Sequence, residues 1–177
     1  MKTYVLTVSR NFPKTHKKHG ELTHFVEKIL VGQYDKNENF YLQDTKAEFD
    51  REIFFECRNP KIHTIRTNYK FWSKRIAEIQ NGNAVLSVRY WSGKPYNSKQ
   101  VEICQLDKDS GCGVQELDFL NSNLSDPVVM SSTNNPHLTR EQLAKNDGLS
   151  LEEFKEWFKG YDLSQPMAII HFTSFRY

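Results

Sequence analysis

Short segments of strand type alternate with segments of helical type along the chain, and this order constrains the fold more than any other feature. Alternating or β-branched apolar residues predict strands over residues 4–9, 61–67, 84–91, 99–106 and 167–175. Apolar residues at helical spacing predict helices over residues 22–31 and 68–80 and after Thr139 and Ser150. The turn residues Ser92-Gly93-Lys94-Pro95 join two of the strands into a hairpin. Mostly antiparallel strands with helices between them predict an α+β fold, built around a small barrel or a strongly curved sheet.

The length of 177 residues favours a single domain spanning residues 1–177. Gly32 is expected to end the first helix. Residues 33–59 are acidic, polar and rich in Phe and Tyr, which is typical of an insertion with short elements of its own. Residues 107–138 hold several turn-forming groups, such as Asp109-Ser110-Gly111 and Asp126-Pro127, and we expect a long loop region there.

Composition excludes several classes of protein. No apolar run is long enough to span a membrane. Three cysteines without a C-x-x-C pair indicate a reduced, cytoplasmic protein. P-loop, dinucleotide-binding and G-x-S-x-G motifs are absent from the sequence, and we expect no cofactor. His16, His19 and His24 lack companion ligands at a settled spacing, so a solvated basic loop is expected there rather than a metal site.

The net charge of +2 conceals a strong segregation of charge. Residues 57–101 carry nine basic residues and a single acid, Glu78, for a charge of +8, whereas residues 102–177 carry −6. Residues 58–75 hold six basic residues and no acid. One interpretation is a polyanionic partner such as RNA or a nucleotide; the other is that basic and acidic segments lie side by side in the fold and cancel.

The segment Lys61-Ile62-His63-Thr64-Ile65-Arg66 combines a basic residue with a hydroxyl at close spacing. On a regular strand Thr64 and Arg66 share one face, and Lys61 meets Thr64 only if the chain bends at the strand's start. Pro60 makes such an irregular entry plausible. A desolvated Lys61 with a lowered pKa could then accept the proton of the Thr64 hydroxyl. The alternative, which spacing alone favours, is a strand edge with exposed basic residues.

Aromatic residues flank a lysine at the tip of the hairpin, in Trp91-Ser92-Gly93-Lys94-Pro95-Tyr96. Trp91 could stack on a base while Lys94 contacts a phosphate. An ordinary hairpin whose aromatic side chains pack on the end of the sheet explains the same residues.

A helix and a glycine precede Lys61-x-x-Thr64-x-Arg66, and the run Leu143-Ala144-Lys145-Asn146-Asp147-Gly148-Leu149 follows after a sheet. This order resembles an ASCH domain over most of the chain, with residues 33–59 and parts of 107–138 as additions. The resemblance implies the PUA-like fold, a small β-barrel with flanking helices, and a role linked to RNA or modified bases.

One bacterial branch with this fold is an amidohydrolase that removes the acetyl group from N4-acetylcytidine. Its Lys acts as general base, its Thr as nucleophile and its Glu as general acid. The resemblance assigns these roles to Lys61, Thr64 and Asp147 here, with Asp147 one methylene shorter than the Glu of that branch.

Two main hypotheses follow for function, and an interaction module with its surface on residues 33–59 is a third possibility. The first is a binding module that holds RNA, a nucleotide or a nucleobase in a basic cleft. The expected ligand-binding residues are Lys61, Thr64, Arg66, Lys70, Lys74, Arg75, Trp91 and Lys94. The second is an amidohydrolase that deacylates N4-acetylcytidine-like nucleosides through Lys61, Thr64 and Asp147.

Overall fold

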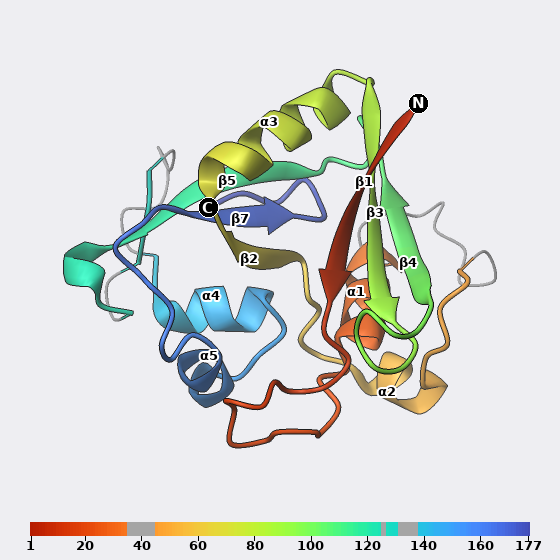
Figure 1. Cartoon of the computed structure of the whole chain (residues 1–177), viewed down its shortest axis with the longest axis horizontal. Helices are drawn as coiled ribbons and strands as arrows, with labels where there is room; N and C mark the ends of the chain where they lie inside the picture. The colour runs from red at the N-terminus through yellow and green to blue at the C-terminus, as the bar shows by residue number, and fades with distance from the viewer. Residues whose placement is uncertain (35–44, 125–126, 131–137) are drawn as a thin grey trace.

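The computed structural model describes residues 1–34, 45–124, 127–130 and 138–177. Strands and helices follow one another in this part of the chain (Figure 1) in the order β1 (Lys2–Val8), α1 (Phe25–Tyr34), α2 (Arg51–Glu56), β2 (His63–Thr67), α3 (Tyr69–Gln80), β3 (Ala84–Trp91), β4 (Gln100–Leu106), β5 (Gly113–Phe119), the 3-10 turn η2 (Leu120–Ser122), β6 (Pro127–Val129), α4 (Arg140–Asn146), α5 (Leu151–Trp157) and β7 (Met167–His171).

The first sheet has the strand order β1-β3-β4. β1 pairs with β3 in parallel, and β3 pairs with β4 in antiparallel fashion, with a register shift between Val88 and Arg89. The predicted hairpin is therefore confirmed. β3 is buried along most of its length, including the polar Ser87, and β4 buries Ile103, Cys104 and Leu106.

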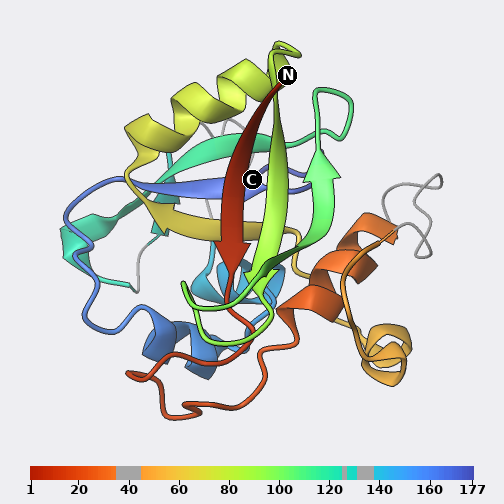
Figure 2. The same ribbon diagram turned by 45° about the vertical axis from the view of Figure 1, so that its right-hand side comes forward.

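The second sheet is antiparallel throughout, with the order β2-β7-β5-β6. α3 packs across β5 and β7, and α4 and α5 lie on the opposite side of β2, as both views show (Figures 1 and 2). The α+β prediction is confirmed. The described strands form two separate sheets and no closed barrel, so the PUA-like barrel stays a prediction.

The helices that position the site begin where their sequences predict. Asn68 caps α3, because its side chain accepts a hydrogen bond from the Phe71 amide. Capping boxes start α4 at Thr139 and α5 at Ser150. The buried face of α3 consists of Trp72, Ile76 and Ile79, the stripe that the spacing predicts.

The expectation of a loop over residues 107–138 is wrong where β5, η2 and β6 lie. β5 buries every second residue, but Gly113 and Gln115 stand on its buried face, so the sequence lacks the apolar alternation of a strand. Gln115 is tolerated there because its side chain bonds the backbone of Tyr177. Residues 125–126 and 131–137 of this segment lie outside the described residues.

Gly32 does not end α1, which continues to Tyr34. A Cβ on Gly32 would lie 3.3 Å from the Lys61 carbonyl oxygen, so the glycine allows α1 to approach the chain that enters β2.

The predicted strand over residues 167–175 is shorter, since β7 ends at His171. Part of the expected insertion, residues 35–44, lies outside the described residues, and α2 is the element described within the rest.

Candidate functional site

The chain enters β2 by an irregular step held by three backbone hydrogen bonds. The Lys61 amide donates to the Lys28 carbonyl of α1 at 3.0 Å, and the Ile62 amide donates to the Asn146 carbonyl of α4 at 2.9 Å. The Ile62 carbonyl accepts from the Phe172 amide at 2.8 Å. β2 begins at His63, so the predicted strand over residues 61–67 is two residues shorter, and the irregular entry that Pro60 makes plausible is present.

Lys61 forms a buried ion pair with Asp147, the C-cap residue of α4. The Lys61 Nζ donates to the Asp147 carboxylate and, at 2.7 Å, to the Asp147 backbone carbonyl. Only 1% of Lys61 and 4% of Asp147 is exposed. Nζ also lies 4.1 Å from the centre of the Phe25 ring. An ammonium group at the carbonyl end of a helix is favoured by the helix dipole as well as by the carboxylate.

Burial dominates the protonation of this pair. Desolvation lowers the pKa of Lys61 to about 8, although the attraction of Asp147 acts in the opposite direction. Desolvation likewise raises the pKa of Asp147 above its ordinary value, against the attraction of Lys61. Burial therefore narrows the difference between the pKa of Lys61 and that of Asp147, so that transfer of a proton from the amine to the carboxylate costs less free energy than it would in water.

Gly148 makes room for the pair. It has a φ of +75°, and a Cβ there would lie 3.0 Å from the Cβ of Lys61. Its carbonyl accepts a hydrogen bond from the Lys28 Nζ at 2.7 Å. The Asn146-Asp147-Gly148 sequence ends α4 in a left-handed turn whose carbonyls face two lysine side chains.

Sequence reasoning did not identify a buried polar cluster beside the ion pair. The Tyr177 hydroxyl lies 2.7 Å from His63 Nε2 and accepts from the Asn146 side-chain amide at 2.9 Å. The direction of the bond between the hydroxyl and Nε2 follows the tautomer of the ring. His63 Nδ1 has no hydrogen-bond partner among the described residues and lies 3.8 Å from the Asp147 carboxylate. The signal that could have located the cluster is the pair of histidines in two strands of the second sheet.

His171 lies opposite His63 in the β2–β7 register, with 5.7 Å between the ring centres. Both histidines are completely buried. Neither ring nitrogen of His171 has a hydrogen-bond partner among the described residues. Burial lowers the pKa of His171 to about 3 and that of His63 well below its ordinary value, so both rings are neutral near pH 7.

Thr64 and Arg66 lie on the strand face opposite His63. Thr64 is 2% exposed, and no hydrogen bond in the described part of the chain joins it to Lys61 or Asp147. The Arg66 guanidinium donates to the Thr7 carbonyl of β1 at 2.7 Å and to the Ile65 carbonyl at 3.1 Å. Arg66 thus links the two sheets. The alternative of a strand edge with exposed basic residues is wrong for Lys61, which is buried.

The basic residues of α3 lie on its outer side. Lys70 and Lys74 are exposed, and Phe71 is 42% exposed. The Arg75 guanidinium lies 3.8 Å from the centre of the Phe71 ring and 4.7 Å from that of Tyr4. These four α3 residues, Lys70, Phe71, Lys74 and Arg75, are called the α3 face below.

The hairpin tip lies away from the α3 face. β3 begins beside the end of α3 and runs away from it, so the turn that holds Lys94 is at the far end of the first sheet (Figure 2). Trp91 packs against Tyr96, with 5.3 Å between the ring centres. The structure does not bring Trp91 and Lys94 together with Lys61 or with the α3 face.

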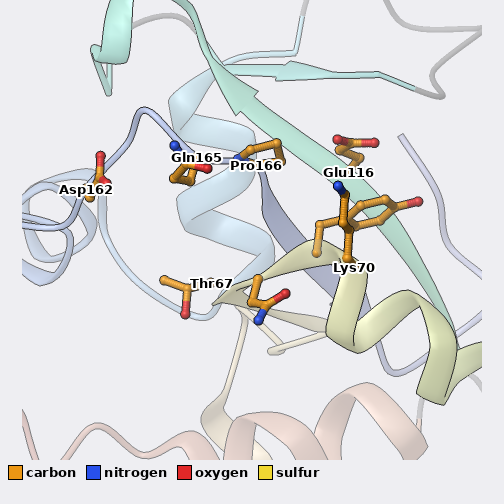
Figure 3. Close-up of a pocket in the computed structure, with 8 residues that line it drawn as sticks. Thr67, Lys70, Glu116, Asp162, Gln165 and Pro166 are labelled. Carbon is orange, nitrogen blue, oxygen red and sulfur yellow. The ribbon is translucent and has the colours of Figure 1, made fainter.

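A pocket of about 490 Å³ lies at the start of α3 (Figure 3). Its lining comes from the β2–α3 junction, from β5 and from the segment before β7: Thr67, Asn68, Tyr69, Lys70, Glu116, Asp162, Gln165 and Pro166. Lys70 is the expected ligand-binding residue that lines it. Sequence reasoning missed the others because they lie far apart in the chain.

The expected solvated histidine loop is partly wrong. His16 is buried, stacks on Phe12 at 4.4 Å and bonds the Glu153 carbonyl and the Lys18 amide. Among the described residues, no three His, Cys, Asp or Glu side chains are grouped as metal ligands would be. Cys57, Cys104 and Cys112 are free thiols.

Comparison with known proteins adds no family. No protein-family model, no curated protein and no solved structure matches the chain. Within the described ranges, none of the helices combines the length and apolar character needed to cross a bilayer.

Proposed function

We propose that the chain is an ASCH-domain protein that binds single-stranded RNA or a nucleotide, and that the α3 face contacts its phosphates. The observation that carries this proposal is a cluster of three cations, Lys70, Lys74 and Arg75, on one helix. No ion pair joins Lys70, Lys74 or Arg75 to a carboxylate in the described part of the chain. This supports the polyanion interpretation of the basic window over mutual cancellation of charged segments.

The single acid of the basic window is itself neutralised. Glu78 accepts a hydrogen bond from the Lys2 Nζ at 3.0 Å, and the basic residues of α3 lie toward the N-terminal end of the helix, at positions 70, 74 and 75. Phe71 adds an exposed ring on which a base can stack, and Arg75 holds that ring on its other side. Phosphate contacts and a stacking ring together are the elements of sequence-tolerant recognition of single strands.

In this proposal Lys61 and Arg66 organise the fold beneath the binding surface. Their cationic groups are bonded to carbonyls and to Asp147, and Lys61 and Thr64 are buried. The proposal therefore assigns ligand binding to α3 and not to the Lys61–Arg66 motif that precedes it.

The test is fluorescence-polarisation titration of a labelled single-stranded RNA at two salt concentrations. The double variant Lys74→Ala, Arg75→Ala should weaken binding at low salt at least about tenfold. It should also reduce the slope of log affinity against log salt by about 1.4, because each phosphate contact on a single strand contributes about 0.7.

The matched control is Lys159→Ala, which removes one exposed lysine beyond α5. It should leave both affinity and slope close to those of the wild type. Absence of binding at low salt, or equal losses of affinity in Lys159→Ala and in the double variant, would contradict the proposal.

A second candidate function is the amidohydrolase, favoured by the contact between Lys61 and Asp147. Their pKa shifts have the directions that a general base and a general acid require. In this reaction the Thr64 hydroxyl attacks the amide carbonyl as Lys61 accepts its proton. Asp147 protonates the leaving nitrogen, and water then releases acetate from Thr64.

Incubation with N4-acetylcytidine, followed by chromatography, tests this second candidate. Cytidine release is expected from the wild type and should fall at least a hundredfold in Thr64→Val, which removes the hydroxyl and keeps the shape of the side chain. If the wild type releases no cytidine, N4-acetylcytidine is excluded as the substrate. If release persists in Thr64→Val, Thr64 is excluded as the nucleophile.

A further inference from the structure

We infer that the pocket at the start of α3 is a base-binding site that selects guanine. This inference deepens the proposed function and rests on it, since Lys70 belongs to the α3 face and also lines this pocket. The volume of about 490 Å³ is within the range of small-ligand sites and exceeds what a single base and its ribose need.

The composition of the pocket lining suits a flat, aromatic ligand. Tyr69 and Pro166 contribute the apolar surface of the lining, and the Tyr69 amide is linked to the Pro166 carbonyl at 3.5 Å. A base stacks well on a tyrosine ring in a site of this kind. Lys70 and Glu116 stand on one side of the pocket and Asp162 on the other, with Gln165 and Pro166 between them (Figure 3).

The charges of the lining favour the base over the phosphate. Two carboxylates, those of Glu116 and Asp162, face one ammonium group, that of Lys70. A phosphate inside the pocket would be repelled by the excess negative charge. The phosphates therefore lie outside, toward Lys74 and Arg75, one helical turn further along α3.

Hydrogen-bond chemistry selects guanine among the bases. A carboxylate only accepts hydrogen bonds, so a lining with two of them favours the base with the most N–H donors on one edge. Guanine offers N1–H and a 2-amino group beside each other, which match the two oxygens of one carboxylate. Its O6 atom, next to N1, accepts from a lysine. Glu116 with Lys70 beside it complements this edge, whereas uracil offers a single N–H there.

The lining is held in place by local hydrogen bonds. The Asp162 carboxylate accepts from the Ser164 amide at 2.9 Å and from the Ser164 hydroxyl at 2.5 Å, both at Oδ1. Asn68 adopts a left-handed conformation with a φ of +64° while its side chain caps α3. Glu116 projects from β5, whose register with β7 is fixed by the pair Glu116↔Ala168. Part of the site is therefore arranged before a ligand binds.

The experiment uses free nucleosides, which carry no phosphate. Guanosine and inosine differ only in the 2-amino group, and protein-observed NMR titration gives the affinity of each. Guanosine should bind at least about tenfold more tightly than inosine, because inosine lacks the 2-amino group that donates a hydrogen bond to the charged carboxylate. Glu116→Gln should reduce that preference to threefold or less, and Lys159→Ala should leave it unchanged.

The possible outcomes separate the inference from the proposed function. Binding of RNA with equal affinities for guanosine and inosine, or with no nucleoside binding, overturns the guanine site and leaves the α3 face intact. A guanosine preference that depends on Glu116, without any RNA binding, supports the pocket and overturns the proposed binding of RNA along the α3 face. Preferential binding of adenosine, cytidine or uridine overturns the choice of base.

Discussion

Replacement of Lys61 by methionine should lower the free energy of unfolding by about 3–5 kcal/mol. The substitution nearly keeps the length of the side chain but removes the charge that faces the Asp147 carboxylate, whose side chain is 6% exposed in the wild type. An uncompensated carboxylate must then either stay charged in a poor solvent or take up a proton. Urea denaturation at pH 7, followed by circular dichroism, measures the loss.

The double variant Lys61→Met, Asp147→Leu distinguishes the contribution of the ion pair to stability from that of the surrounding packing. Because an apolar replacement of both partners removes the desolvation cost along with the attraction, the double variant should recover most of the lost stability. A loss below about 1 kcal/mol in the single variant would mean that the buried ion pair does not control stability. A double variant as unstable as the single one would assign the loss to packing.

The protein should lose about 2 kcal/mol of stability between pH 6.5 and pH 5.5 because of its two buried histidines. The folded pKa of His171 is about 3, against an ordinary value of 6.5, and that of His63 is also far below 6.5. Below pH 6.5 the unfolded chain binds protons that the folded protein does not. Stability therefore falls as the pH falls, and it is fully present above the unfolded pKa. Urea denaturation at several pH values measures the slope.

The variant His171→Leu isolates one of the two histidines. It should roughly halve the loss between pH 6.5 and pH 5.5, and it should raise stability at pH 7 by about 1 kcal/mol because two unpaired ring nitrogens are removed. Asp147 acts in the opposite sense, since its raised pKa lets the folded state take up a proton first. That contribution is common to both proteins and cancels in the comparison. An unchanged slope in His171→Leu would contradict the assignment.

The local elements were predictable from the sequence for a local reason. Asn68, Thr139 and Ser150 cap helices with their own side chains, and the bonds they make span three residues. The hairpin of β3 and β4 is also a neighbouring pair, joined by turn residues. Such features depend on residues that are close together in the sequence, so a pattern of a few residues is enough to predict them.

The candidate site was predictable only in part. The resemblance to ASCH domains paired Lys61 with Asp147, and the structure brings these two side chains into contact across 86 residues of sequence. Thr64, the third member, is not joined to them by a hydrogen bond in the described part of the chain. Trp91 and Lys94, which were predicted to bind the same ligand as Lys61, lie at the far end of the first sheet, away from β2 (Figure 2).

By itself, the sequence determined the α+β class, the hairpin, the capped helices and the concentration of positive charge in residues 57–101. The tertiary structure decided which residues meet. β5 carries glutamine and glycine on its buried face, so its place in the sheet depends on β7 and on the Tyr177 backbone that Gln115 bonds. His63, His171 and Tyr177 form a buried cluster through strand register, and Lys70 meets Glu116 and Asp162 in one pocket through packing. Contacts of this kind join distant parts of the chain, so no local pattern of residues predicts them.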